Sequence, residues 1–189
     1  MRNIVAFEHM TLDGYASSGR GLGFEWTQRA YTQELAEYAQ HIQSDFDLAV
    51  YGRRTYLGMY GYWSSQPTAE STTVEQAHAV WVNAVDKIVC SNTLASAEWN
   101  NTRVVRGDLA AEFGRLKASD GGTIAVYASP TLVHGFVELG LIDEFRIVVH
   151  PVVVGGGTAV FPAAAALDLD LVESCSFDGG ATYLRYRIA

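Results

Sequence analysis

Short apolar runs alternate along this chain with longer segments of helical periodicity, and this alternation constrains the fold more than any other feature. The apolar runs predict strands at residues 3–7, 47–51, 87–90, 103–105 and 123–127. The segments between them predict helices at residues 27–44, 74–84, 109–116 and 131–139. Strands that alternate with helices favour an α/β fold in which helices cover both faces of a mostly parallel sheet.

The last part of the chain has a different pattern. Residues 145–149, 167–176 and 181–188 are strand-like, and Asp178-Gly179-Gly180 between the last two is typical of a hairpin turn. We therefore expect the sheet to finish in antiparallel strands. No linker or shift in composition divides the 189 residues, so the sequence predicts a single domain over residues 1–189.

Composition excludes several classes of partner. The 13 basic and 21 acidic side chains give a net charge of -8, which disfavours binding to nucleic acid or to an anionic membrane. The acidic Glu8 comes too early in the chain for the apolar core of a signal peptide, so no secretion signal is expected. The longest apolar stretches are interrupted by charges and glycines, so no membrane span is expected. Cys90 and Cys175 form no CxxC pair, and the five histidines have no metal-binding spacing. We predict a cytoplasmic protein without a metal site.

The first candidate binding site is the turn that follows the strand at residues 47–51. Gly52 permits a tight turn there, and Arg53, Arg54 and Thr55 are expected to open the next helix. Backbone N–H groups, the positive end of a helix, a hydroxyl and two guanidinium groups then converge, which is typical of an anion site. The alternative is that the arginines are solvated and that Thr55 only caps the helix.

A second turn of the same kind follows the strand at residues 123–127. Its small residues lead into a helix, and two helix N-termini could flank one pyrophosphate. The candidates in this turn are Ser129, Pro130, Thr131 and Leu132. Ser91 follows the strand at residues 87–90 in the same way and could contact a ribose or its phosphate. Ordinary helix capping and a plain turn are the respective alternatives.

Two glycine-rich segments and a group of aromatic residues complete the candidates. The polar loop at residues 9–24 is a candidate lid that contains a predicted mobile segment at residues 19–23. Gly155, Gly156 and Gly157 lack the GxGxxG spacing of a dinucleotide loop, and we expect flexible backbone beside a ligand. Aromatic residues that include Trp26 and Tyr56 could line a pocket for a flat ring, although core packing is the alternative for each of them.

Four motifs in a fixed order carry a family resemblance over nearly the whole chain. They are Thr11-Leu12-Asp13-Gly14-Tyr15, Gly52-Arg53-Arg54-Thr55-Tyr56, Gly140-Leu141-Ile142-Asp143-Glu144 and Pro151-Val152-Val153-Val154-Gly155-Gly156-Gly157. Together they resemble the dihydrofolate-reductase-like fold, and most closely the reductase domain of the riboflavin-biosynthesis deaminase-reductase, the RibD C-terminal domain family. The resemblance implies a three-layer α/β sandwich and a homodimer.

The resemblance also implies an activity and assigns roles to residues. It implies an NADPH-dependent reductase of a small heterocyclic or ribosylamino-pyrimidine substrate, similar to 5-amino-6-(5-phosphoribosylamino)uracil reductase. The implied cofactor-binding residues are Gly52, Arg53, Arg54, Thr55, Ser91, Ser129, Pro130, Thr131 and Leu132. Asp13 is the first candidate for proton donor or substrate anchor, and Glu25 is the second. The candidates for contact with the substrate are Asp13, Trp26, Tyr56, Gly155, Gly156 and Gly157.

Two departures from the family pattern keep alternatives open. Folate reductases carry a carboxylate five positions after a loop tryptophan, but here the residue five positions after Trp26 is Tyr31, so folate is a poor substrate candidate. Ala128 stands where a glycine is usual, and its methyl group could crowd a diphosphate. These departures favour a non-catalytic nucleotide- or small-molecule-binding protein as one alternative. A broad-specificity reductase unrelated to riboflavin is the other.

Overall fold

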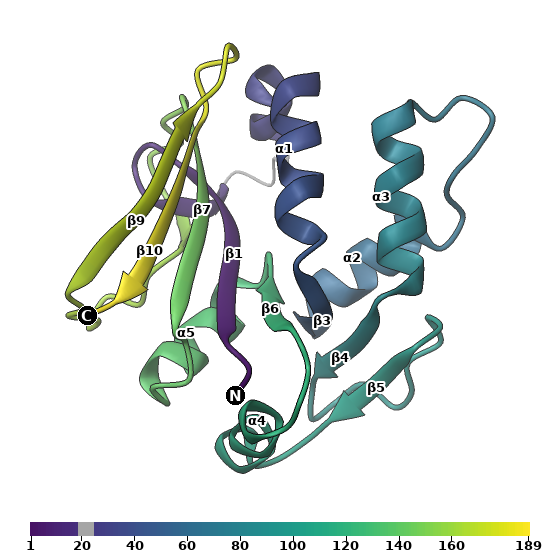
Figure 1. The fold of residues 1–189 in the computed structure, drawn as a ribbon, viewed down its shortest axis with the longest axis vertical. Coiled ribbons are helices and arrows are strands. Elements are labelled where there is room, and N and C mark those ends of the chain that lie inside the picture. The colour runs from purple at the N-terminus through teal and green to yellow at the C-terminus, as the bar shows by residue number, and fades with distance from the viewer. Residues whose placement is uncertain (19–24) are drawn as a thin grey trace.

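The chain is built on an eight-stranded sheet, seen in a computed structural model that describes residues 1–18 and 25–189. In order across the sheet, its strands are β5 (Thr102–Val105), β4 (Asp86–Cys90), β3 (Phe46–Gly52), β6 (Thr123–Tyr127), β1 (Ile4–Thr11), β7 (Glu144–His150), β10 (Thr182–Ile188) and β9 (Leu169–Ser176). Neighbouring strands are parallel from β5 to β7, whereas β10 pairs antiparallel with both β7 and β9. The antiparallel strands therefore lie at the opposite end of the sheet from β4 and β5 (Figure 1). The predicted mostly parallel sheet with antiparallel C-terminal strands is confirmed.

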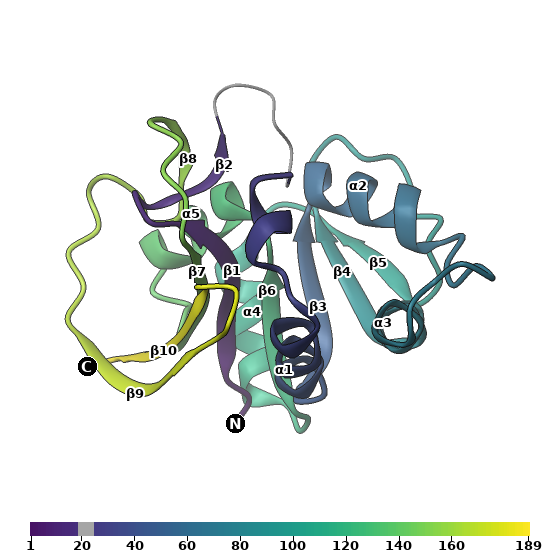
Figure 2. The same ribbon diagram turned by 90° about the horizontal axis from the view of Figure 1, so that it is seen from above.

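Helices cover both faces of this sheet (Figure 2). On one face lie α1 (Gln33–Gln43), α2 (Arg53–Trp63) and α3 (Thr73–Ala84), and on the other lie α4 (Leu109–Ala118) and α5 (Pro130–Glu138). A 3-10 helix, η1 (Glu25–Ala30), precedes α1, and a small sheet pairs β2 (Tyr15–Ser18) with β8 (Gly157–Ala159). This arrangement is the predicted three-layer α/β sandwich.

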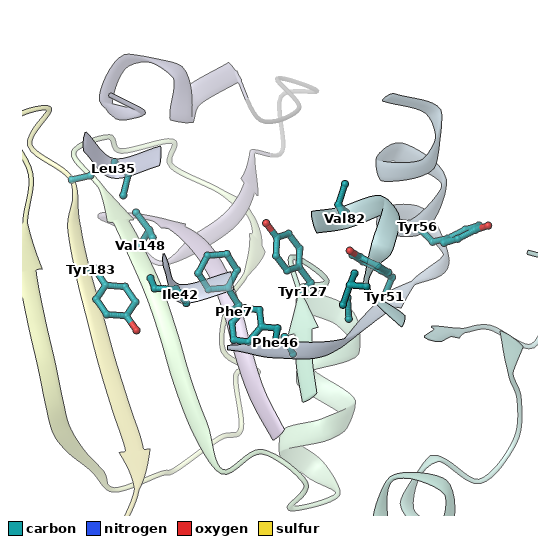
Figure 3. Packing of buried hydrophobic residues seen from close by; sticks show 14 of the residues in the cluster. Phe7, Leu35, Ile42, Phe46, Tyr51, Tyr56, Val82, Tyr127, Val148 and Tyr183 are labelled. Carbon is teal, nitrogen blue, oxygen red and sulfur yellow. The ribbon is translucent and has the colours of Figure 1, made fainter. Parts of the chain in front are cut away.

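The central strands are apolar because both of their faces are covered. Residues 4–7 of β1 are all at most 1% exposed, as expected for an inner strand of a parallel sheet. Phe7 points into the core under α1, where it packs near Phe46, Ile42 and Tyr127 (Figure 3). The alternate side chains of β1 pack into a second core under α4 and α5. Alternate side chains of β1 therefore pack into different cores, one on each face of the sheet.

The structure differs from the sequence prediction around residues 9–44. The helix predicted at residues 27–44 is divided into η1 and α1, because the Thr32 side chain accepts a hydrogen bond from Leu35 N–H and starts α1 afresh. The predicted loop at residues 9–24 begins later, since pairing with β7 extends β1 to Thr11 and pairing with β8 forms β2. The predicted mobile segment at residues 19–23 lies outside the described residues, so the lid stays a prediction.

None of the helices described here is both long and apolar enough to cross a bilayer.

Candidate active site

Three of the predicted binding turns meet at one edge of the sheet. The neighbouring parallel strands β4, β3 and β6 end at Cys90, Gly52 and Tyr127, so the turns after them lie side by side. Arg53 Nη1 donates a hydrogen bond of 3.2 Å to Thr93 Oγ1, which links the turn after β3 to the turn after β4. The carboxyl edge of an open α/β sheet is where ligands bind in such folds. The structure therefore brings together the segments predicted to bind a cofactor.

Two hydroxyl groups join the turns after β3 and β6. Ser129 Oγ accepts a hydrogen bond of 3.0 Å from Gly52 N–H, and Thr55 Oγ1 donates one of 2.8 Å to the carbonyl oxygen of Ala128. Both side chains therefore hold the two turns in register. Gly52 has a φ of -74°, which any residue adopts, so this turn does not depend on the conformational freedom of glycine.

The two helix starts at this edge suit an anion. The N-cap residues of α2 and α5, Gly52 and Ser129, provide no side-chain hydrogen bond to the first turn. At α2 this leaves helix N–H groups available. At α5, Pro130 has no N–H and the N–H of Leu132 donates to the Ser129 carbonyl oxygen, so this helix start offers the N–H of Thr131. Arg53 and Arg54 are exposed, and neither forms an ion pair within residues 1–18 and 25–189. Uncapped N–H groups beside two unpaired guanidinium groups fit the diphosphate of a dinucleotide.

Ala128 occupies a strained position between these turns. Its φ is +45°, a left-handed conformation that residues with a side chain rarely adopt. The strain costs roughly 1–2 kcal/mol. The Ala128 N–H donates a hydrogen bond of 3.0 Å to the Phe7 carbonyl oxygen, and its own carbonyl accepts from Thr55. These bonds hold the backbone in the conformation that a glycine would adopt freely.

A cavity of about 830 Å³ opens beside the two turns, between α1, α2, α3 and the ends of β1 and β6. Arg54, Thr55 and Ala128 belong both to the turns and to the lining of the cavity. The other lining residues are His9, Thr27, Gln28, Tyr31, Ala36, Gln40, Gln43, Gly58, Met59, Tyr62, Trp63, Val74, Glu75, His78 and Tyr127. This volume is in the range of sites that bind drug-sized ligands. A ligand in the cavity would lie next to one held by the turns.

A pair of histidines lies beside the cavity, and His9 is the member that lines it. His9 Nδ1 and His150 Nε2 are 2.8 Å apart, although the two residues are 141 positions apart in the chain. Trp26 packs edge-on against the His150 ring, and the ring centroids of Tyr31 and His9 are 5.8 Å apart. Burial lowers the pKa of His9 to about 3 and that of His150 to about 4, so both rings are neutral at pH 7.

The hydrogen bonding of this pair indicates where its protons lie. His150 Nδ1 is buried and has no partner within the described residues. A buried N–H without an acceptor is costly, so the proton of neutral His150 belongs on Nε2, where it donates to His9 Nδ1. Neutral His9 then carries its proton on Nε2. Because His9 lines the cavity, this N–H is the group that the pair offers to a ligand.

Glu8 is a buried carboxyl group next to the start of α5. It is 1% exposed, and its Oε1 accepts a hydrogen bond of 2.9 Å from Ser129 N–H. Its Oε2 is buried without a partner among the residues described. Burial raises the pKa of Glu8 from 4.5 to about 8, so the group is mostly protonated at neutral pH. This neutral acid leaves the anion-binding character of the helix start intact.

Asp13 holds a loop and does not line the cavity. Its carboxylate accepts hydrogen bonds from the Thr11 hydroxyl at 2.6 Å and from Gly155 N–H at 2.8 Å. The Thr11 hydroxyl, followed by backbone N–H groups that include that of Gly155, lowers the pKa of Asp13. Asp13 is therefore held ionised, which suits the positioning of the loop and disfavours proton donation. The structure brings Asp13 and Gly155 into direct contact. Gly155 and Gly156 have positive φ values of 72° and 153°.

The remaining predicted residues are distributed more widely. Tyr56 is 1% exposed, and its hydroxyl accepts a hydrogen bond from Trp99 N–H, so it packs in the core and not in the cavity. Trp26 is not among the lining residues and contacts His150, the partner of His9. Glu25 is exposed in the first turn of η1, and its role as a second proton donor stays a prediction. In the described residues, no group of three or more His, Cys, Asp or Glu side chains is arranged to hold a metal ion.

Sequence reasoning missed the groups contributed by β1 and β7. Glu8 and His9 interrupt the apolar pattern directly after the buried residues 4–7, and polar residues at the end of a central strand were the available signal. His150 ends β7 in the same way. Their meeting depends on the parallel pairing of two strands that are distant in the sequence, and no local pattern records that pairing.

The fold and the site define an α/β protein with a candidate anion site beside a ligand-sized cavity. A model of the RibD C-terminal domain matches residues 2–183, and the chain therefore belongs to this family. The Bacillus subtilis (strain 168) protein YyaP, itself uncharacterized, is 27% identical over 186 residues, which are 98% of this chain and 94% of that protein.

Solved structures share the fold at low sequence identity. A proposed riboflavin biosynthesis protein from Shewanella sp. PV-4 has a TM-score of 0.77 at 20% identity, with 99% of each chain covered. Dihydrofolate reductase from Enterococcus faecalis, complexed with NADP(H), has a TM-score of 0.62 at 12% identity, with 98% of this chain and 96% of that chain covered. Family and fold together support an oxidoreductase activity.

Proposed function

We propose that the chain is an NADPH-dependent reductase of a small heterocyclic substrate, the class that includes the ribosylamino-pyrimidine of riboflavin biosynthesis. The observation that carries this proposal is the position of Arg53 and Arg54, which form no ion pair among the described residues, and of two helix starts without a side-chain cap, beside a cavity of about 830 Å³. A cofactor diphosphate and a substrate ring need adjacent sites of these two kinds. Membership of the RibD C-terminal domain family adds to this support.

The residues of the two turns would hold the cofactor. Arg53 and Arg54 would pair with phosphate oxygens, and the N–H groups at the start of α2, with the N–H of Thr131 at the start of α5, would donate to them. The hydroxyls of Thr55 and Ser129 would act indirectly, because they fix the two turns relative to each other. When bound, NADPH supplies the hydride that reduces a C=N or C=O carbon.

The cavity residues would orient the substrate. His9 Nε2–H would donate a hydrogen bond to the nitrogen or oxygen of the reducible bond, which draws electrons away from the carbon that receives the hydride. The proton that completes the reduction would come from water in the cavity. Asp13 would keep the loop with Gly155 in place at the rim.

Calorimetric titration with NADPH and with NADH tests the cofactor half of the proposal. Each charge-assisted hydrogen bond is worth about 1.5–3 kcal/mol, so Arg53→Ala/Arg54→Ala should weaken NADPH binding by about 100-fold or more. Arg187→Ala is the matched control, because Arg187 is an exposed arginine on β10, at the far end of the sheet. Failure of the wild type to bind either dinucleotide would reject the proposal.

A second candidate function is a nucleotide-binding protein without turnover. The strained Ala128, whose methyl group stands at the turn, favours this candidate. Substrate-dependent oxidation of NADPH separates the two functions, because the binding protein would bind the dinucleotide and oxidise none of it.

We also propose that the protein is a cytoplasmic homodimer. Its two cysteines are free in the structure, which suits a reducing compartment. The edge strand β9 exposes Leu171 and Val172, at 56% and 43%, next to an unpaired row of backbone groups. Light scattering after size exclusion should give the mass of two chains, and Leu171→Lys should shift it towards one.

A further inference from the structure

The cavity is lined by large rings and a flexible thioether along α2 and the segment just before α1. Tyr31, Met59, Tyr62 and Trp63 contribute these groups, and Tyr127 adds a further ring from the end of β6. The Tyr62 and Trp63 rings pack edge to face at 4.8 Å, and Trp63 also packs on His78 at 4.3 Å. Surfaces of this kind favour a flat ring that stacks on aromatic side chains.

The polar groups deep in the cavity form a chain without charge. Gln43 Nε2 donates a hydrogen bond of 2.8 Å to Tyr127 Oη, and Gln43 Oε1 lies 2.8 Å from His78 Nδ1. Gln43 and Tyr127 are almost fully buried, and burial lowers the pKa of His78 to about 4. The three residues come from α1, β6 and α3, so the chain crosses the cavity floor as one neutral network.

Tyr127 is the member of this network that can bind a ligand. Its oxygen already accepts the bond from Gln43, and its own proton has no acceptor in the described part of the chain. The ring is held between Phe7 and Tyr51, at 5.1 and 5.9 Å (Figure 3). A fixed neutral O–H donor in an apolar cavity selects a ligand with an uncharged acceptor such as a ring carbonyl.

Charged groups are scarce in the same lining. Arg54 is the cation among the lining residues described, and it belongs to the turn assigned to the cofactor. Glu75 adds a carboxylate to the lining. A phosphate group of the substrate would leave water for a largely apolar cavity whose described cation is already assigned to the cofactor, and the Glu75 carboxylate would repel it. Phosphorylated substrates are therefore disfavoured.

We infer that the cavity binds a flat, uncharged ring that carries a carbonyl group and no phosphate, with Tyr127 Oη–H as the donor to that carbonyl. This inference rests on the proposed function for the identity of the cavity as the substrate site. It narrows the proposed substrate class, because it excludes phosphorylated ribosylamino-pyrimidines.

Binding of three flavins to the full chain, without dinucleotide, tests the inference. Lumiflavin carries the bare carbonyl-bearing ring, riboflavin adds an uncharged ribityl chain, and FMN adds a phosphate to that chain. Fluorescence titration should show binding of lumiflavin. FMN should bind at least ten-fold more weakly than riboflavin. If the ribityl chain already prevents riboflavin from binding, FMN should not bind either. Binding of FMN as tight as that of riboflavin would overturn the inference, as would the absence of lumiflavin binding.

Two matched variants test the role of Tyr127. Tyr127→Phe keeps the ring and removes the donor, and it should weaken lumiflavin binding by about five- to ten-fold. Tyr51→Phe makes the same change in a buried tyrosine on β3 that does not line the cavity, and binding should stay within two-fold of the wild type. Thermal unfolding of both variants checks that they fold. Equal binding by Tyr127→Phe and the wild type would remove Tyr127 from the inference.

The two experiments distinguish a failure of this inference from a failure of the proposed function. The flavin series uses no cofactor, whereas the calorimetric titration uses no substrate. Dinucleotide binding with tight FMN binding would reject only the substrate class. The expected flavin series without dinucleotide binding would keep the cavity as a site for neutral rings and reject the reductase.

Discussion

Replacement of Glu8 by glutamine should stabilise the protein at alkaline pH and leave it unchanged at acid pH. Glu8 is 1% exposed, and burial raises its pKa from 4.5 to about 8. The folded state therefore binds a proton that the unfolded state releases between these two values. A raised pKa contributes stability that is complete below pH 4.5 and is lost as the pH rises through 8.

The size of the effect follows from the shift in pKa. Each unit is worth 1.36 kcal/mol, so a shift of about 3.5 units costs the wild type roughly 5 kcal/mol at pH 8.5 relative to pH 4.5. This figure is an upper limit, because water that enters the native state would reduce it. Glutamine keeps the acceptor for Ser129 N–H and has the shape of the protonated acid, but it does not titrate.

Urea unfolding of the wild type and Glu8→Gln at several pH values between 5 and 8.5 measures this effect. The free energies of unfolding should agree within about 1 kcal/mol at pH 5 and diverge by several kcal/mol at pH 8.5. Other titrating groups contribute equally to both proteins and cancel in the difference. Glu70→Gln, the same change at an exposed glutamate, should show no such divergence. A difference that stays constant with pH would refute the argument that Glu8 is a buried acid.

Three further predictions concern residues around the cavity. Burial lowers the pKa of His78 from 6.5 to about 4. The stability that neutral His78 contributes is therefore present above pH 6.5 and falls by up to roughly 3 kcal/mol as the pH drops to 4. In urea unfolding, His78→Gln should not show this loss of stability at acid pH. Tyr51 Oη is buried without a partner among the described residues, so Tyr51→Phe should raise the free energy of unfolding by about 1 kcal/mol, and a loss would contradict this. Ala128→Gly should relieve the strained φ and, after the entropy cost of glycine, stabilise by up to about 1 kcal/mol; a fall in melting temperature would count against that strain.

The fold was predictable because its signals are local. Each strand and helix of the alternating part has its own apolar spacing, and the hairpin signal at residues 178–180 identified the antiparallel end. Local signals also located the turns after β3 and β6, since glycine, arginine, serine and proline have defined preferences at helix starts. The division of the helix predicted at residues 27–44 was missed because periodicity outweighed the capping signal of Thr32.

The interior of the candidate site was not predictable in the same way. His9 meets His150 across the pairing of β1 with β7, and Gln43 joins His78 to Tyr127 across three elements. Each of these residues taken alone has an ordinary place on its own strand or helix. Their chemistry arises from tertiary contacts, which change the pKa values and fix the donors and acceptors. A single sequence does not record those contacts.

The register of β1 decides which of its titratable side chains meets the turn before α5 and which enters the cavity. Successive side chains of a strand point to opposite faces, so Glu8 meets Ser129 under α5 while His9 enters the cavity under α1. The pairing of Phe7 with Tyr127 on one side and with Arg146 on the other fixes this register. A shift of one residue would place a carboxyl group in the cavity and an imidazole at the start of α5. The buried residues 4–7 oppose such a shift, because each core accepts only one set of alternate side chains. The packing that stabilises the sheet therefore also decides which titratable group faces the turn before α5 and which faces the cavity.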